Sequence, residues 1–227
     1  MEDILVVIPA RGGSKGLPGK NIKNLCGKPL ISYSIDVARA ITIDDNICVS
    51  TDDQKIIDVV EKYGLHVPFV RPAELASDTA STNDVLLQAI KFYEEKGKKY
   101  TKVLLLQPTS PLRTVDQVKE AITLYRNDID MVVSVTKSHA PAVLCNDNDE
   151  GFVDLVYNKH AGGRQSLPTF YEFNGAIYVI NIEALKQKGL GGFDKRVKYV
   201  MSKETSIDID DIYDFMLIEA IKRNKIG

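Results

Sequence analysis

The 227-residue sequence has few cysteines, no long apolar run and almost no excess of charge. Its three cysteines, Cys26, Cys48 and Cys145, lie far apart and form no C-x-x-C pair, which argues against a disulfide framework or a zinc site. Such isolated thiols are typical of a reducing compartment. No run approaches the roughly 18 apolar residues of a membrane span, and acidic Glu2 and Asp3 stand where a signal peptide would be basic. We therefore expect a cytoplasmic protein with no membrane segment.

The charge of the chain is nearly balanced, with one local exception. A formal net charge of -2 gives the surface as a whole no reason to bind nucleic acid. Between Ala10 and Ile35, however, there is no acidic residue, and the basic residues are Arg11, Lys15, Lys20, Lys23 and Lys28. A local field of this kind suits a small anion. At 227 residues the chain can bury a sizeable core, and it is most simply one domain, residues 1–227.

The basic stretch directly follows a continuous apolar run, residues 4–8, which predicts a central strand buried on both faces. After Pro9 the backbone can turn and bring its N–H groups close to an anion, because the next positions include Gly12, Gly13, Gly16 and Gly19. Neither a Walker loop nor a Rossmann loop has this glycine spacing. The pattern therefore predicts a polyphosphate cradle, and the alternative is a flexible surface loop with solvated lysines.

Apolar strand patterns alternate with amphipathic helix patterns along most of the chain. We expect the further strands at residues 47–49, 66–70, 103–106, 131–135, 176–180 and 197–200, with a helix at 182–188. This alternation predicts an α/β fold of three layers, in which helices cover both faces of a mainly parallel sheet. The alternation stops between residues 136 and 173, which we interpret as an insertion. Long insertions in compact domains are usually functional.

Polar side chains follow the strand expected at 103–106. Such loops at the carboxyl ends of strands are where open α/β sheets bind ligands. The polar residues here exceed what a turn requires, and they are Gln107, Thr109, Ser110 and Arg113. The alternative is a rigid crossover turn, stiffened by its two prolines. Upstream, Ser81 and Asp84 have the spacing of a helix capping box, which is the structural interpretation of Ser81.

Two aspartates near the C-terminus alternate with isoleucines. Strand alternation would place Asp208 and Asp210 on one face, about 7 Å apart, where they could share a divalent cation with phosphate oxygens. The alternative is a helix N-terminus with favourable acids, which explains Asp210 and Asp211 but says little about Asp208. In the helix that follows, the predicted inner stripe is Ile212, Phe215, Met216 and Ala220.

The run I-P-A-R-G-G-S-K-G-L-P-G-K-N at residues 8–21 closely resembles the signature of the cytidylyltransferases that activate sialic acids and related nonulosonic acids. Further matches are L-Q-P-T-S-P-L-R at 106–113, R-Q-S-L-P at 164–168, N-G-A-I-Y at 174–178 and I-D-I-D at 207–210. The resemblance spans nearly all of the chain. It implies a Rossmann-like nucleotidyltransferase fold and transfer of CMP from CTP to the anomeric hydroxyl of an N-acylneuraminate-type acid, with release of pyrophosphate.

The resemblance also implies roles for individual residues. The catalytic residues would be Arg11, Lys20, Asp208 and Asp210, the two aspartates holding Mg²⁺, with Mn²⁺ as an alternative. The nucleotide-binding residues would be Ala10, Arg11, Gly12, Lys15, Lys20, Asn21, Arg71 and Ser81. The acceptor-binding residues would be Gln107, Arg164 and Tyr178. The insertion at 136–173 would exchange with a second subunit in a homodimer, so that Arg164 reaches the acceptor carboxylate across the interface.

Several alternatives remain open at this point. Val143 stands two places after Pro141, where several sialic acid enzymes have a lysine, so legionaminic acid or a deaminated sialic acid is an alternative acceptor. The eight-carbon acid Kdo is disfavoured, because that family's loop lacks the G-G-S-K-G-x-P-G-K-N form. The rivals are a sugar-1-phosphate nucleotidyltransferase and a non-catalytic nucleotide-binding protein. His139 and His160 have no acid partner or metal spacing in the sequence, and we expect them to be ordinary histidines.

Overall fold

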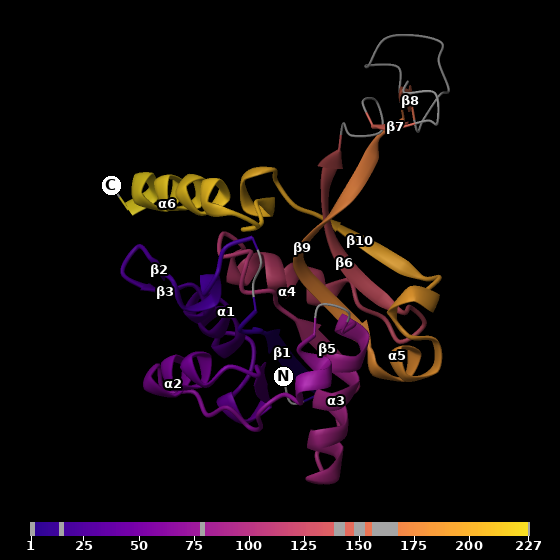
Figure 1. Cartoon of the computed structure of the whole chain (residues 1–227). Coiled ribbons are helices and arrows are strands. Elements are labelled where there is room, and N and C mark those ends of the chain that lie inside the picture. The colour runs from indigo at the N-terminus through magenta and orange to yellow at the C-terminus, as the bar shows by residue number, and fades with distance from the viewer. Residues whose placement is uncertain are drawn as a thin grey trace.

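A six-stranded sheet forms the centre of the computed structural model, which describes residues 3–13, 16–77, 80–138, 144–147, 153–155 and 168–226 (Figure 1). The strand order is β10-β6-β9-β5-β1-β4. The strands are β1 Ile4–Pro9, β4 Ile47–Ser50, β5 Lys102–Leu105, β6 Met131–Ser138, β9 Phe170–Asn181 and β10 Arg196–Val200. Only β9 runs antiparallel to its neighbours, β5 and β6. The predicted α/β fold with a mainly parallel sheet is confirmed.

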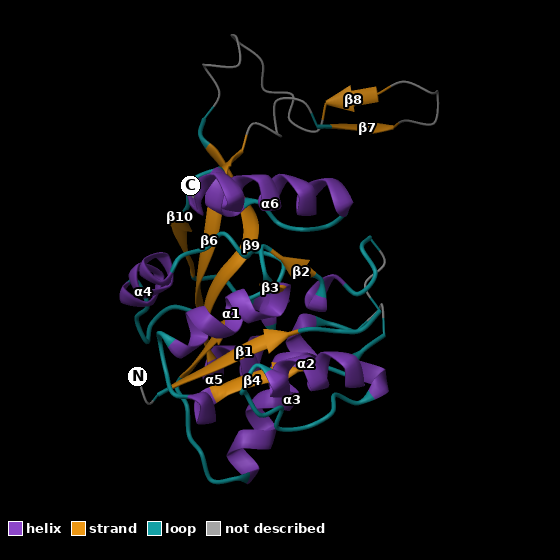
Figure 2. Ribbon diagram, turned by 90° about the vertical axis from the view of Figure 1, so that its left-hand side faces the viewer, coloured by secondary structure: helices purple, strands orange, loops and turns teal. Residues whose placement is uncertain are grey.

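Helices cover both faces of this sheet (Figure 2). One face packs against α1 Leu30–Arg39, α2 Gln54–Lys62 and α4 Val115–Thr123, and the other against α3 Thr82–Glu95 and α5 Ile182–Lys188. The first strand joins the two cores, because alternate residues from Ile4 to Ile8 enter opposite clusters and all five are completely buried. Burial of such side chains stabilises the fold by about 1.5–3 kcal/mol each. None of the described helices has the length and apolar character needed to cross a membrane.

The last helix, α6 Ile212–Ile226, packs on a third small cluster beside the β2 Asn24–Leu25 and β3 Lys28–Pro29 hairpin. Its inner stripe is Phe215 and Ile218, which are 4% and 0% exposed. The predicted stripe is wrong in its other members, since Met216 is 58% exposed, Ile212 is 39% exposed and Ala220 is also exposed. Apolar residues occupy both sides of this helix, so periodicity alone could not decide which side packs.

The segment at 66–70 was predicted as a strand. It forms only an isolated bridge, between Val70 and Thr51, the residue that follows β4. The neighbouring Arg71 N–H donates to the Thr51 carbonyl at 2.7 Å. Pro68 lacks an N–H donor, which prevents a regular ladder through this segment. The segment therefore runs beside the edge of the sheet and leads into the ligand crevice described below.

The strands β6 and β9 continue into the predicted insertion. Their ladder pairs Thr136 with Glu172 and Ser138 with Phe170, so the strand predicted at 176–180 is too short. The register of this ladder shifts beside Gly175, whose φ is 73°. A glycine is favoured at this position because it adopts a positive φ without strain. The ladder projects as an arm (Figure 1), and within the insertion the structure also describes β7 Cys145–Asp147 paired with β8 Val153–Leu155. Residues 139–143 and 156–167, which include His139, His160, Val143 and Arg164, lie outside the described residues.

Candidate active site

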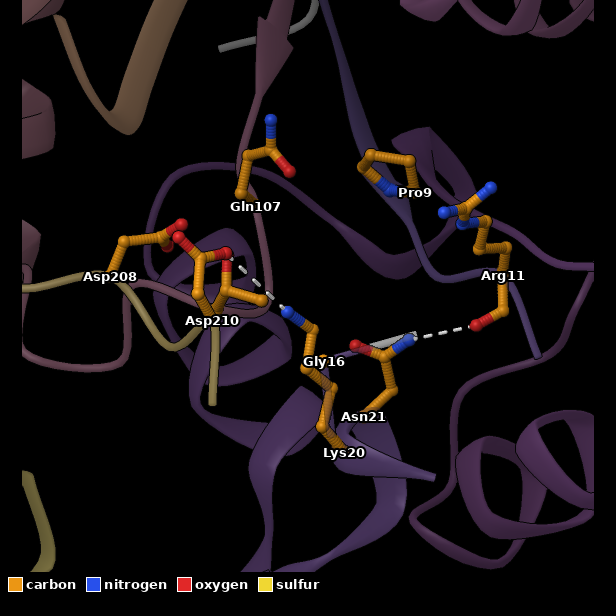
Figure 3. A pocket seen from close by; sticks show the side chains of 9 residues that line it. Pro9, Arg11, Gly16, Lys20, Asn21, Gln107, Asp208 and Asp210 are labelled. Atoms are coloured by element: carbon orange, nitrogen blue, oxygen red, sulfur yellow. Dashed lines mark hydrogen bonds and ion pairs between the residues drawn. The ribbon is translucent and has the colours of Figure 1, made fainter. Parts of the chain in front are cut away.

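A cavity of about 370 Å³ opens at the carboxyl ends of β1 and β5, the edge where open α/β sheets bind ligands (Figure 3). It is built from three segments that are distant in sequence: the glycine-rich loop after β1, the loop after β5, and the aspartate segment before α6. Its lining residues are Pro9, Arg11, Gly16, Lys20, Asn21, Gln107, Thr109, Asp208 and Asp210. The structure therefore brings together six site residues predicted from separate motifs, which are Arg11, Lys20, Asn21, Gln107, Asp208 and Asp210.

A second cavity of about 280 Å³ adjoins the first and shares Pro9, Arg11 and Gln107 with it. The remaining lining residues come from the segment between β4 and α3 and from the start of α3: Arg71, Leu75, Ser77, Ala80, Thr82 and Val85. Because three residues line both cavities, the two form one crevice with two compartments. Of this second group, only Arg71 was predicted from the sequence, because the other residues are ordinary loop and helix residues without a distinctive pattern.

The glycine-rich loop and the aspartate segment are in direct backbone contact. Lys20 Nζ donates to the Ile209 carbonyl at 2.6 Å and lies 4.0 Å from Asp210 Oδ1. A Cβ atom at Gly16 would lie 2.3 Å from the Asp210 carbonyl oxygen, well inside van der Waals contact. The aspartate segment is held from its other side, where the Ile209 N–H donates to the Thr109 carbonyl at 3.0 Å. The position of the loop thus depends on a glycine at residue 16.

Two side chains hold the loop from within the protein. Asn21 is 5% exposed, and its Nδ2 donates to the Arg11 carbonyl at 3.1 Å. The Gly12 N–H donates to Asp52 Oδ1 at 3.0 Å. No motif in the sequence singles out Asp52, and the cap of α2 is the neighbouring Asp53, so sequence reasoning missed this contact. Ala10 is buried, and its N–H donates to the Ser50 carbonyl at 2.9 Å, which anchors the start of the loop to β4.

The basic residues of the stretch do not all face the crevice. Arg11 and Lys20 line it, but Lys23 lies 5.4 Å from the ring centroid of Phe215. Lys28 pairs with Asp36 and lies over the Tyr33 ring. Lys15 lies outside the described residues. Of the five basic residues in this stretch, Lys23 and Lys28 therefore do not face the crevice, and their charges lie on the surface beside α1 and α6.

The two predicted nucleotide-binding residues outside the glycine-rich loop, Arg71 and Ser81, differ in their surroundings. Arg71 lines the second cavity and is 5% exposed, with its Nε donating to Ser50 Oγ at 2.9 Å. Burial lowers the pKa of this guanidinium, and the charge of Asp52 opposes the shift. Ser81 caps α3 by accepting from the Asp84 N–H at 3.2 Å, and it is not among the described residues that line either cavity. The geometry thus agrees with the interpretation of Ser81 as a helix cap.

The residues predicted for the acceptor are also divided. Gln107 lines both compartments of the crevice. Tyr178 lies half-buried on β9, opposite Leu105 of β5, and is not among the described lining residues. Burial raises the pKa of the Tyr178 phenol, and the charge of Asp208 raises it further, which places that carboxylate within electrostatic reach. Arg164 lies outside the described residues.

Asp208 and Asp210 extend into the same cavity, with the buried Ile209 between them (Figure 3). The cap of α6 is a different residue, since Asp211 Oδ1 accepts from the Tyr213 N–H at 2.7 Å and the Asp214 N–H at 3.1 Å. The helix-start alternative therefore describes Asp211 better than the other two aspartates. In the described part of the chain no three His, Cys, Asp or Glu side chains gather as a metal site. Two carboxylates nevertheless fit Mg²⁺, which usually binds through one or two carboxylates, substrate phosphates and waters.

Arg113 is a buried cation that sequence reasoning placed only in a polar loop. It is 5% exposed, and its Nη1 donates to the carbonyls of Gln107 at 2.8 Å and Ala176 at 2.9 Å. Its Nη2 donates to the Ser34 hydroxyl. Burial lowers the pKa of Arg113 to about 9, against the opposing charge of Asp208. The side chain thus ties the loop after β5 to β9 and α1, and its positive charge lies within electrostatic reach of Asp208.

Comparison with known proteins places the chain in a family. The cytidylyltransferase family model matches residues 5–226. The N-acylneuraminate cytidylyltransferase of Escherichia coli O18:K1:H7 is 37% identical over 98% of this chain and 52% of its own length. The CMP-N,N'-diacetyllegionaminic acid synthase of Legionella pneumophila is 34% identical over 96% of this chain and 95% of that protein. The pseudaminic acid cytidylyltransferase of Campylobacter jejuni is 36% identical over 92% of each chain.

The chain spans about half the length of its Escherichia coli and Streptococcus agalactiae relatives, and nearly the whole length of the other two. Its fold is similar to that of a CMP:2-keto-3-deoxy-manno-octonic acid synthetase solved in complex with CTP, with a TM-score of 0.72 at 18% identity over 98% of this chain and 99% of that one. The resemblance found in the motifs therefore extends over the whole chain and its fold. The chain belongs to the cytidylyltransferase family of nucleotidyltransferases.

Proposed function

We propose that this protein transfers CMP from CTP to the anomeric hydroxyl of an N-acylneuraminate-type nonulosonic acid and releases pyrophosphate. The observation that carries the proposal is the crevice itself, where Arg11 and Lys20 face Asp208 and Asp210 across the carboxyl ends of the sheet. Cations and carboxylates in one cavity are what a triphosphate with a divalent cation requires. A protein that only bound nucleotides would need the cations but not the paired carboxylates.

The proposed roles follow the two compartments of the crevice. Arg11 and Lys20 bind the triphosphate, Asn21 holds the loop in place, and the compartment beside Arg71 takes the cytidine. Asp208 and Asp210 hold Mg²⁺, or alternatively Mn²⁺, which when bound neutralises charge on the phosphates. Catalysis of this kind depends on positioning and on neutralising charge rather than on a protein nucleophile. Rigid placement of these side chains is therefore the main contribution of the fold.

The acceptor belongs at the mouth shared by both compartments, where Gln107 lies. The named relatives act on N-acylneuraminate, diacetyllegionaminic acid and pseudaminic acid, and all are similar to this chain at 34–37% identity. We propose an N-acylneuraminate-type acid, with legionaminic acid and a deaminated sialic acid as alternatives. Tyr178 and Arg164 are the further proposed acceptor residues, the arginine because a guanidinium binds a carboxylate through two hydrogen bonds.

CTP should be the preferred nucleotide. We expect kcat/KM for CTP to exceed that for UTP by on the order of 10²-fold or more, because a polar pocket matched to one base edge leaves buried groups unpaired with the other. The measurement is pyrophosphate release with CTP, UTP, ATP and GTP against a panel of nonulosonic acids, Kdo and sugar 1-phosphates. Comparable turnover of CTP and UTP would contradict this expectation, and turnover of sugar 1-phosphates alone would favour the rival transferase.

A homodimer is the proposed assembly, with the arm as part of its interface. The described part of the insertion and its base expose large apolar side chains, with Phe173 57%, Leu144 50% and Tyr171 38% exposed. Such side chains on one projecting element mark an interaction surface. We expect sedimentation at micromolar concentration to give a dimer, and Phe173→Glu to weaken it. Ile43→Glu, at a 65% exposed site far from the arm in sequence, is the matched control. A monomeric wild type, or equal effects of both substitutions, would reject the arm as the interface.

A further inference from the structure

Ser110 makes a contact that the proposed reaction does not yet use. Its hydroxyl donates to Asp208 Oδ1 at 3.1 Å, although the two residues are 98 positions apart in the sequence. The serine is completely buried, so water does not compete for this hydroxyl. A neutral hydroxyl that donates to a carboxylate in a dry environment fixes the orientation of the carboxylate without cancelling its charge.

The loop that carries Ser110 is itself held rigidly. The Thr109 carbonyl, one residue earlier, accepts from the Ile209 N–H at 3.0 Å, so the loop and the aspartate segment are joined at two adjacent points. Arg113 ties the other end of the loop to β9 and α1 through the carbonyls of Gln107 and Ala176 and the hydroxyl of Ser34. Ser110 therefore acts from a fixed position relative to the sheet.

The two carboxylates of the cavity differ in this respect. Asp208 is half-buried and tied through one oxygen, and in the described part of the chain its Oδ2 accepts no hydrogen bond. The Asp210 side chain is 86% exposed. Among the described residues, its one cationic partner is Lys20, whose Nζ lies 4.0 Å from Asp210 Oδ1. One carboxylate is thus oriented before any ligand binds, whereas the other is free to adjust.

We propose that Ser110 is a positioning residue that orients the Asp208 carboxylate and leaves its second oxygen for the divalent cation that accompanies the triphosphate. This inference rests on the proposed function, because it needs Asp208 as a ligand. Partners that orient a ligating side chain typically change metal affinity by about 10- to 100-fold when they are removed. Without Ser110, the Asp208 carboxylate could rotate, and binding of the cation would have to restrain that rotation.

The test compares Ser110→Ala with Ser32→Ala. Ser32 is also completely buried, but its hydroxyl donates to the Pro29 carbonyl at 2.6 Å, away from the crevice. The first readout is the rise in melting temperature that CTP gives with Mg²⁺ and with EDTA, in the absence of an acceptor. The second readout is the Mg²⁺ concentration at half-maximal pyrophosphate release. We expect Ser110→Ala to retain the CTP shift in EDTA, to lose most of the extra shift from Mg²⁺, and to need about 10- to 100-fold more Mg²⁺.

A merely structural role of the serine would lower the melting temperature without ligand and leave the Mg²⁺ increment unchanged. That outcome, or a Mg²⁺ requirement equal to that of Ser32→Ala, overturns the proposal while the proposed reaction stands. Absence of the Mg²⁺ increment in the wild type also overturns it, because Asp208 would then hold no cation. Ser110→Thr, which keeps the hydroxyl, should restore the Mg²⁺ increment. Should the alanine variant fail to fold, Ser110→Cys carries the same test, since a thiol is a weak donor.

Discussion

Asp208→Asn and Asp210→Asn should each lower the turnover number by on the order of 10²-fold or more, corresponding to at least about 2.7 kcal/mol of lost transition-state stabilisation. Asparagine keeps the volume of aspartate but removes a charge from a cavity that also contains Arg11 and Lys20. The cations of the loop would then bind the triphosphate without the matching carboxylates. Steady-state pyrophosphate release at saturating CTP and acceptor measures the loss, and melting without ligand should change little.

The matched control is Asp211→Asn, which removes the same charge one residue further along the chain. Asp211 caps α6 through two backbone N–H groups, and asparagine caps helices about as well as aspartate. We therefore expect nearly wild-type turnover from this variant. Near-wild-type turnover and an unchanged Mg²⁺ dependence in both Asp208→Asn and Asp210→Asn would show that the cation, if required, is held elsewhere.

Gly16→Ala should lower kcat/KM for CTP by about 10²-fold, although it removes no functional group. The added methyl would lie only 2.3 Å from the Asp210 carbonyl oxygen, and backbone cannot move aside as easily as a flexible side chain. The loop and the aspartate segment must then separate, which moves Lys20 away from Asp210. A displacement of about 1 Å in a positioning element can cost 10²-fold in rate. The measurement is kcat/KM for CTP at saturating acceptor, together with the melting temperature.

Gly13→Ala is the control within the same loop, because a Cβ atom there meets no atom of the described residues within 4 Å, its two chain neighbours aside. The loss of kcat/KM in Gly13→Ala should therefore be at least ten-fold smaller than in Gly16→Ala. A ten-fold difference corresponds to about 1.4 kcal/mol. Equal losses from both substitutions would mean that the loop needs glycines for its approach to the ligand. Wild-type activity in Gly16→Ala would mean that the contact between the loop and the aspartate segment is not needed for CTP.

Much of the framework was predictable from the sequence, because it is set by local patterns. The run at 4–8 predicted a strand buried on both faces, and the bounds of α5 agree with the helix predicted at 182–188. Alternation of Asp208, Ile209 and Asp210 predicted that both carboxylates face one cavity while the isoleucine is buried. Each of these features depends on a repeat of two or 3.6 residues, which neighbouring residues determine by themselves.

Other features were decided only by the tertiary structure. The apolar residues on both sides of α6 allowed either face to pack, and the third core cluster selected Phe215 and Ile218. The pattern of charges and glycines alone did not distinguish Lys23 and Lys28 from Lys20, but aromatic rings and an acid of α1 and α6 hold them away from the crevice.

The contacts that orient the site were likewise outside the reach of the sequence. Asp52 accepts from the Gly12 N–H across 40 positions, and Ser110 donates to Asp208 across 98. Gly16 has no role in its own turn that distinguishes it from Gly13, and its importance comes from the carbonyl of Asp210. Local periodicity determines which side of a segment is buried, but not which distant segment packs there. That choice arises when the strands are ordered in the sheet and their carboxyl ends meet.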